Sequence, residues 1–197
     1  MRWTRTDLNT SQKSYTLNSE LRRHRTLICK YVNFYFPEFS NIGPSNNLRD
    51  FKCCVQPYTL IFVPSYFDFV RVRNFLNKED VDVAPISEYS PDDDVSRART
   101  MFYQGRLATI VTTERFYFYR RLRIRGIRHI IFYSVPTLSH FYSEFLNLVE
   151  EATSQSIPTS SITLYSRYEK VPLERVVGTD RVTKMVDPSS KSTFLFT

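Results

Sequence analysis

Short apolar runs alternate with helix-like segments over residues 58–197, and this alternation restricts the possible folds more than any other feature of the sequence. Each run is apolar along its whole length and rich in strand-forming residues, which is typical of a strand buried on both faces. Such strands with helices between them predict an α/β fold, a three-layer sandwich around a parallel sheet with right-handed crossovers. We expect strands near 58–63, 82–88, 107–113, 128–134, 161–167 and 192–196. We expect helices over 65–80, 90–105 and 139–152.

The segment 90–105 has the clearest helix signals. Ser90 is a candidate N-cap and Pro91 a candidate first helical residue, while Asp92–Asp94 complement the positive end of the helix dipole. Gly105 can end the helix. The acidic triplet is therefore interpreted as dipole complementation in preference to a metal site.

The first 57 residues lack this regular alternation. Residues 8–30 could hold a helix around the stretch 18–32, and residues 37–48 are rich in Pro, Gly, Ser and Asn, which predicts a linker. We therefore expect an N-terminal extension over 1–57, partly helical or loosely ordered, followed by one α/β domain over 58–197.

The sequence has no recognisable metal-binding, nucleotide-binding or membrane-spanning motif. Cys29, Cys53 and Cys54 have no metal-ligand spacing, and reduced thiols are the expected state. The chain has only four glycines and no G-x-x-x-x-G-K-[ST] loop to hold phosphates. No apolar stretch is long enough to cross a membrane. We expect no cofactor, no metal, no membrane contact and no small-molecule substrate.

Positive charge is concentrated in two places. The net charge of +7 includes seven basic and two acidic residues within 1–30, and six arginines with no acid within 115–128. Two basic regions on an otherwise acidic body suit a polyanionic partner, because phosphate neutralisation releases counterions. Alternatively, the arginine stems cover apolar surface while their charged ends are solvated.

Four consecutive aromatic residues, 116–119, lie inside the second basic region. They could stack on unpaired bases while the neighbouring arginines hold phosphates, as in readers of single-stranded RNA. Four consecutive positions on a helix point in every direction, however. We therefore expect about half of these aromatics to be buried and the arginines to be mostly exposed.

The order of elements from Tyr58 to Leu148 resembles the second RecA-like lobe of superfamily 2 helicases, a P-loop NTPase-like fold here without the P-loop. The stretch 59–76 occupies the place of helicase motif IV, a strand that leads into a loop and a helix. The stretch 87–114 resembles the path to motif V. In that register Arg97 matches an arginine of the helicase helix, and Thr113-Glu114 stand where DEAD-box proteins have Thr-Asp.

Four motifs resemble the digestive organ expansion factor family, a helicase-like component of the small-subunit processome: "PSYFDFVRVRN", "VSRAR", "TERFYFYRR" and "PTLSHFYSE". The stretch "LYSRYEKVPLERVVG" is similar to that family's C-terminal strand and helix. The resemblance covers about 58–197. The family's first RecA lobe and acidic N-terminal region have no counterpart here, which predicts a fragment or a reduced form.

The resemblance implies a ribosome-biogenesis factor of the nucleus and nucleolus that acts in 18S rRNA maturation. The partners it implies are pre-rRNA, small nucleolar RNA and other processome proteins. Two alternatives stay open. The chain could be a pure protein scaffold that docks through residues 113–125, or one lobe of an active RNA helicase completed by further sequence.

Helicase motif VI reads approximately Tyr-Ile-His-Arg-Ile-Gly-Arg, and its arginines neutralise charge on the transferred phosphoryl group. At the same spacing this chain has residues 142–148, with Phe145 and Leu148 at the arginine positions and Glu144 at the histidine. Loss of such an arginine costs on the order of 10³–10⁵ in rate. We therefore expect a pseudohelicase with no catalytic residues, in which Phe145 and Leu148 pack against the sheet and Glu144 could pair with an arginine.

Candidate RNA-binding residues come from three stretches of the sequence. Ser65 and Tyr66 lie where helicases contact the RNA backbone, although Ser65 could simply cap a helix. Arg71 and Arg73 could extend the basic face or pair with nearby acids. The complete candidate set is Ser65, Tyr66, Arg71, Arg73, Thr113, Arg115, Tyr117, Tyr119, Arg120, Arg121, Arg123 and Arg125.

Overall fold

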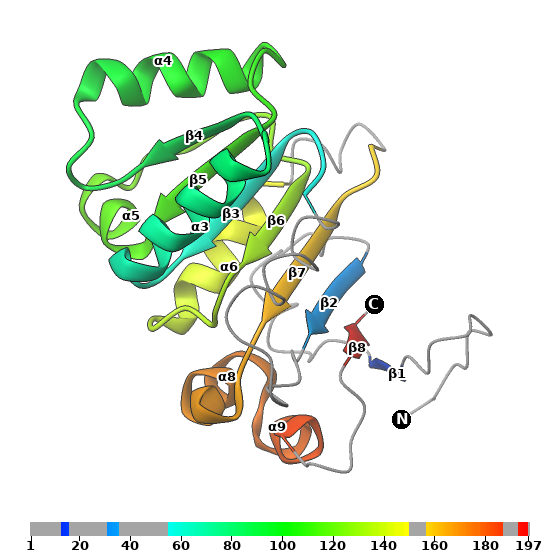
Figure 1. Cartoon of the computed structure of the whole chain (residues 1–197). Helices are drawn as coiled ribbons and strands as arrows, with labels where there is room; N and C mark the ends of the chain where they lie inside the picture. The colour runs from blue at the N-terminus through cyan, green and yellow to red at the C-terminus, as the bar shows by residue number, and fades with distance from the viewer. Residues whose placement is uncertain (1–12, 16–30, 36–54, 150–156, 187–192, 197) are drawn as a thin grey trace.

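A computed structural model describes residues 13–15, 31–35, 55–149, 157–186 and 193–196 of the chain (Figure 1). Within these residues one eight-stranded sheet has the order β1-β8-β2-β7-β6-β3-β5-β4. Its strands are β1 (Lys13–Tyr15), β2 (Tyr31–Tyr35), β3 (Thr59–Val63), β4 (Val83–Ile86), β5 (Thr109–Thr113), β6 (His129–Phe132), β7 (Ser160–Leu164) and β8 (Thr193–Phe196). The helices are α3 (Tyr66–Lys78), α4 (Asp92–Tyr103), α5 (Glu114–Arg120), α6 (Ser139–Asn147), α8 (Lys170–Val177) and α9 (Thr179–Val186), with a 3-10 turn at Arg167–Glu169.

The centre of the sheet is parallel, as predicted. β3 lies between β5 and β6, so Leu60 is opposite Ile110 on one side and Ile130 on the other. β4 and β7 extend this parallel set in either direction. Every residue of β3 and β5 is buried. β3 is accordingly an almost wholly apolar run, whereas β5 also buries three threonines.

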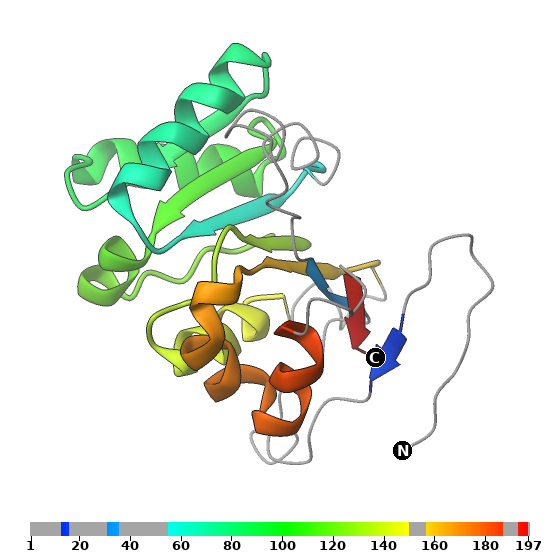
Figure 2. The same ribbon diagram turned by 60° about the horizontal axis from the view of Figure 1, so that its bottom comes forward.

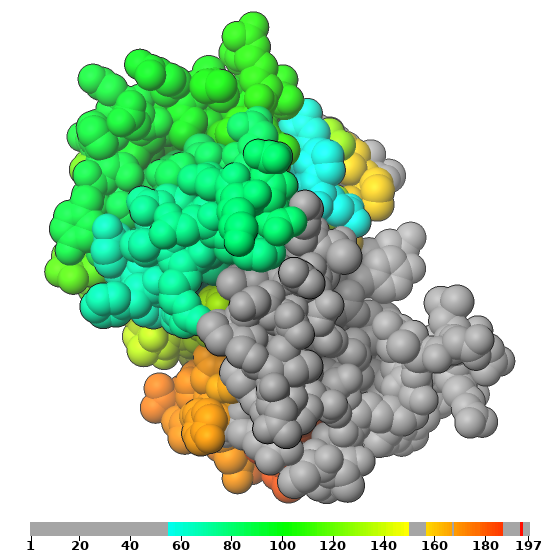
Figure 3. All heavy atoms as spheres, in the orientation of Figure 1, coloured from blue at the N-terminus to red at the C-terminus, as the bar shows by residue number. Residues whose placement is uncertain are grey.

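Helices cover both faces of the sheet. Alternate residues of β3 and β5 pack against Phe69, Val72 and Leu76 of α3 on one face. The side chains of Leu60, Phe62 and their neighbours pack on the other face against α4, α5, α6, α8 and α9. Figure 2 shows α3 above the sheet with α6, α8 and α9 below it. In the space-filling view the cyan-green atoms of α3 lie together in the upper half of the molecule (Figure 3).

The sheet extends beyond the predicted strands at one edge. β2 pairs in parallel with β7, and β8 lies between β2 and β1, antiparallel to β2 and parallel to β1. The expected final strand therefore exists but runs opposite to the parallel set. Residues 13–15 and 31–32, in the region expected to hold a helix, belong to β1 and β2, while 8–12 and 16–30 lie outside the described residues. The division into 1–57 and 58–197 stays a prediction, although β1 and β2 of the first part join the sheet.

The N-terminus of α4 differs by one residue from the expectation. The helix begins at Asp92 with Pro91 as its N-cap. The Ser90 hydroxyl does not cap it but accepts a hydrogen bond from the Ser87 backbone N–H at 3.0 Å, within the preceding turn. At the other end Gly105 has a φ of +74°, and a Cβ there would collide with the Tyr58 hydroxyl, so this glycine ends the helix as expected.

Candidate nucleic-acid interface

Thr113 ends β5 and acts as the N-cap of α5. Its hydroxyl accepts a hydrogen bond from the Phe116 backbone N–H at 3.1 Å and donates one to Glu88 Oε2 at 2.8 Å. The side chain is 1% exposed. The Thr113 side chain is therefore buried and engaged within the domain, and its RNA contact stays a prediction.

Glu114, at the position of the DEAD-box aspartate, is turned into the protein. It is 8% exposed and accepts hydrogen bonds from the backbone N–H groups of Thr137 and Leu138, each at 3.2 Å. Leu138 is the N-cap residue of α6 and Thr137 precedes it. The first N–H groups at a helix start have no partner within the helix. The carboxylate thus caps α6 and ties it to α5. Sequence spacing placed Glu114 in the motif but gave no sign of this contact.

The four aromatic residues of α5 divide as expected. Phe116 is buried, Tyr117 is half-buried, and Phe118 and Tyr119 are exposed. The Tyr117 ring lies 4.4 Å from that of Phe145, centre to centre. Burial, followed by the hydrogen bond and charge of Glu144, raises the pKa of Tyr117 to about 12. Tyr119 therefore offers more of its ring to a base than Tyr117 does.

Arg121 connects α5 to α6. Its backbone has a φ of +47°, a left-handed conformation that ends the helix. Its Nη1 donates to both carboxylate oxygens of Glu144, at 3.0 and 2.8 Å. The guanidinium also lies over the Phe141 ring, 4.8 Å from its centre. Glu144, at the position of the helicase histidine, therefore pairs with an arginine as anticipated.

The segment that follows α5 runs alongside α4 in the same direction. Arg120 Nη2 forms a 2.7 Å ion pair with Asp92 at the start of α4. Arg99, further along α4, donates a 2.7 Å hydrogen bond to the Arg123 carbonyl. Gly126 lies beside Tyr103 at the end of α4. This path spreads the arginines along the surface instead of gathering them into a pocket.

We call the exposed arginines of α5 and this segment the basic strip: Arg115, Arg120, Arg121, Arg123 and Arg125. Among the described residues, three of them, Arg115, Arg123 and Arg125, form no ion pair with a carboxylate. Arg115 lies over the Tyr119 ring, 5.9 Å from its centre. The strip therefore presents free guanidinium groups beside an exposed aromatic ring, which is the combination that single-stranded RNA requires.

The remaining candidates lie on the opposite face, with α3. Ser65 is at the N-cap position but its side chain makes no capping hydrogen bond. Tyr66 is partly exposed and stacks on Phe69. Arg71 pairs with Asp68 at 3.3 Å, and the Arg73 guanidinium donates to Asn74 Oδ1. Arg71 and Arg73 lie along α3, across the sheet from α5, so the structure does not assemble the twelve candidates into one surface.

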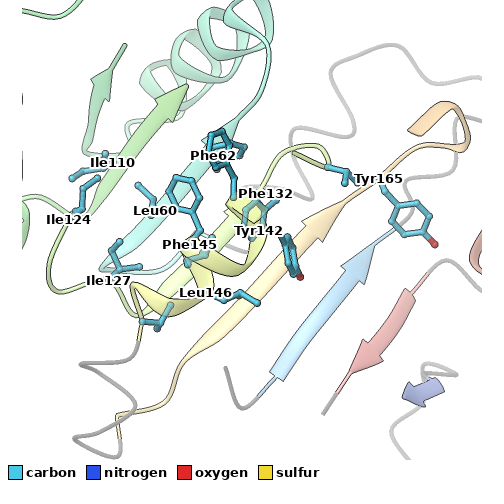
Figure 4. Close-up of a cluster of buried hydrophobic side chains, with 14 of the residues drawn as sticks. Leu60, Phe62, Ile110, Ile124, Ile127, Phe132, Tyr142, Phe145, Leu146 and Tyr165 are labelled. Atoms are coloured by element: carbon cyan, nitrogen blue, oxygen red, sulfur yellow. The ribbon is translucent and has the colours of Figure 1, made fainter. Parts of the chain in front are cut away.

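The two former arginine positions of motif VI belong to the core. Phe145 is fully buried, with its ring centre 4.6 Å from that of Phe62 and 6.1 Å from that of Phe132 (Figure 4). Leu148 is half-buried and packs against the same cluster. Both side chains therefore pack against the sheet as predicted.

The two histidines that the structure describes, His129 and His140, contact neighbouring side chains of the domain. His129 Nδ1 lies 2.8 Å from the Ser160 hydroxyl, and burial, with the charge of Arg128, lowers the pKa of His129. The His140 ring contacts Phe141. Among the described residues no carboxylate orients His129.

The described residues include no group of three or more His, Cys, Asp or Glu side chains that could hold a metal. None of the described helices is long and apolar enough to span a bilayer.

Known sequences similar to this chain belong to one family. The sequence model described as the Utp25 C-terminal domain matches residues 45–196. The U3 small nucleolar RNA-associated protein 25 homolog of Rattus norvegicus is 45% identical over 150 residues, 76% of this chain and 20% of that protein. Protein NUCLEOLAR FACTOR 1 of Arabidopsis thaliana is 41% identical over 145 residues, 74% of this chain and 19% of that protein. The chain thus spans about a fifth of the length of these relatives.

Solved structures show the same fold. The Escherichia coli DEAD-box protein SrmB, bound to regulator of ribonuclease activity A, matches with a TM-score of 0.53 at 13% identity, over 83% of this chain and 81% of that chain. A DEAD-box protein of Methanococcus jannaschii matches with a TM-score of 0.52 at 14% identity, over 85% of this chain and 39% of that chain. The predicted helicase-type, RecA-like lobe is therefore confirmed.

Proposed function

The chain belongs to the Utp25 family through its C-terminal domain, and on that premise we propose that it is a nucleolar ribosome-biogenesis factor that contacts RNA without catalysis. The names of the relatives support this, since they describe a U3 small nucleolar RNA-associated protein and a nucleolar factor. The partners we propose are pre-rRNA, small nucleolar RNA and neighbouring processome proteins.

The observation that carries the RNA contact is the basic strip. Its five arginines are exposed, and three of them form no ion pair among the described residues. Arg120 and Arg121 are held by Asp92 and Glu144, so they contribute less charge to a ligand than their number suggests. The free arginines, together with the exposed rings of Phe118 and Tyr119, form the surface that suits single-stranded RNA.

We expect the variant Arg115→Gln/Arg123→Gln/Arg125→Gln to bind single-stranded RNA more weakly and with less dependence on salt. Each phosphate contact with a single strand contributes roughly −0.7 to the slope of log affinity against log salt concentration. Loss of three contacts should therefore reduce the magnitude of this slope by about 2. Fluorescence anisotropy with a labelled oligouridine across a salt series measures it.

A matched control is available on the same chain. Lys78, Arg175 and Lys184 are exposed and lie outside the basic strip, and their replacement by glutamine removes the same total charge. We expect this control variant to keep most of the native salt slope. Equal slopes for the native chain and the strip variant would exclude the strip as the RNA site. Such a result would favour the alternative in which Phe118 and Tyr119 anchor a protein, because an apolar interface responds weakly to salt.

We expect the chain to show no ATP hydrolysis, with or without RNA. Phe145 and Leu148 place apolar groups where a helicase has its motif VI arginines, and the sequence has no loop to hold phosphates. A coupled assay of phosphate release, with an active DEAD-box protein as positive control, measures this. RNA-stimulated hydrolysis after addition of a separately prepared first RecA lobe of a full-length relative would support the rival view, that the chain is half of an active helicase.

A further inference from the structure

Three exposed aromatic residues follow the carboxyl ends of β3 and β4. Tyr66 and Phe67 begin α3 and are 39% and 82% exposed, and Tyr89, in the loop after β4, is 69% exposed. The ring centres of Tyr66 and Tyr89 are 5.3 Å apart with an interplanar angle of 80°. We call these three residues the aromatic corner. The basic strip does not include them. The contact between Tyr66 and Tyr89 joins the start of α3 to the loop after β4, which are not adjacent in sequence.

The corner is held in place before any ligand arrives. Tyr66 stacks on the buried Phe69, with ring centres 5.8 Å apart. In the other loop, the Ser87 N–H donates to the Ser90 hydroxyl at 3.0 Å and the Ser90 N–H donates to the Ser87 carbonyl at 3.0 Å, forming a turn around Tyr89. Rigid, exposed rings bind a partner at a low cost in conformational entropy.

Five carboxylates are close in sequence to the corner. Asp68 follows Phe67, Glu88 precedes Tyr89, and Asp92–Asp94 begin α4 directly after this loop. Two of the five carboxylates are neutralised by arginine, Asp68 by Arg71 and Asp92 by Arg120. The corner is therefore locally acidic on a chain whose net charge is +7. RNA phosphates are repelled here, while cationic side chains are attracted both to the carboxylates and to the faces of the tyrosine rings.

We infer that the aromatic corner is a docking site for an arginine-rich, partly apolar segment of another protein. Arginine suits the site better than lysine because its planar group stacks on aromatic rings and is more weakly hydrated. An apolar residue of the same segment covers Phe67. The corner and the basic strip share no residue, so separate variants test the two sites.

The test uses the whole 197-residue chain and two labelled peptides, four repeats of Arg-Leu-Gly and four repeats of Glu-Leu-Gly. We expect the chain to bind the arginine peptide and not the glutamate peptide in fluorescence anisotropy. Because the chain is itself cationic overall, attraction of a cationic peptide must come from a local acidic site. The variant Phe67→Ser/Tyr89→Ser should bind the arginine peptide about tenfold or more weakly, as expected when anchoring aromatics are removed.

Two further variants separate this site from general surface effects. Tyr168 is 97% exposed in the loop after β7, and Tyr168→Ser should leave peptide binding unchanged. Asp93→Asn/Asp94→Asn keeps the rings and removes two carboxylates, and should weaken binding and reduce its salt dependence. Circular dichroism checks that each variant is folded, which we expect because Phe67 and Tyr89 are largely exposed.

Several outcomes would overturn the inference. The native chain could fail to bind the arginine peptide, or the Phe67→Ser/Tyr89→Ser variant could bind it as tightly as the native chain. Loss of oligouridine binding in that variant would instead make the corner a site for RNA bases. Loss of self-association in sedimentation velocity would make it a contact between copies of this chain. Because the arginine variants of the basic strip leave the corner intact, failure of the RNA proposal is distinguishable from failure of this one.

Discussion

Phe145→Arg, which restores one arginine of motif VI, should unfold the domain and create no ATPase activity. Phe145 is fully buried between α6 and the sheet, in contact with Phe62, Phe132 and Tyr117. Phe145→Ala alone should lower the free energy of unfolding by about 3–5 kcal/mol through the lost contacts and the cavity. Arginine adds the cost of burying a charge with no partner. Since a domain of this kind has about 5–15 kcal/mol in total, little or no folded protein should remain.

Urea unfolding followed by circular dichroism measures this change, with His140→Arg as the control. His140 is exposed on the same helix, so an arginine there should change the free energy of unfolding by less than about 0.5 kcal/mol. If Phe145→Arg were as stable as the native chain, Phe145 would not be part of the core. The side chain could then turn toward a ligand, and the proposal of a non-catalytic lobe would lose its main support.

Glu114→Ala should have the second largest effect. The buried carboxylate accepts two backbone hydrogen bonds at the start of α6, and hydrogen bonds to a charged group contribute about 1.5–3 kcal/mol each. Its removal takes the charged acceptor from two N–H donors just before α6, so we expect a loss of about 3 kcal/mol or more. Glu114→Gln should be intermediate, because the amide oxygen can still accept while its nitrogen faces the second donor.

Denaturant unfolding and amide hydrogen exchange together test this role. Exchange at Thr137 and Leu138 should accelerate in Glu114→Ala more than exchange in the central strands. Glu144→Ala is the matched control, since this more exposed carboxylate forms a surface ion pair with Arg121, and such pairs contribute about 1 kcal/mol or less. Equal losses for the two variants would mean that burial at position 114 has no special importance.

The central strands could be predicted from sequence because burial on both faces leaves a continuous apolar run. The strand expected at 107–113 is β5, Thr109–Thr113, and the strand expected at 128–134 is β6, His129–Phe132. The edge strands lack this signature. β1 and β2 are defined by their pairing with β8 and β7 from the distant end of the sequence, and no local pattern encodes that pairing.

For α5, the sequence predicted what fraction of the aromatic residues is buried, but not which side chains contact one another. Helical geometry alone required that some of residues 116–119 be buried, and it correctly indicated exposed arginines. It could not indicate which arginines are neutralised. Arg120 meets Asp92 and Arg121 meets Glu144 only because α4, α5 and α6 pack on the same face of the sheet. The contact between Tyr66 and Tyr89 also depends on tertiary packing, so no local sequence pattern predicted it.

The position of β8 between β1 and β2 has a consequence for the order of folding. Pairing of β3 with β5 and β6 closes loops of moderate length, whereas Lys13 of β1 meets Phe194 of β8 across almost the entire chain. Longer loops cost more entropy to close, and contacts between distant residues slow folding. The parallel centre should therefore form first and the β1-β8-β2 edge should dock last. The same edge is the part of the sheet that can open locally while the centre, with α5 and α6 fixed on it, stays folded.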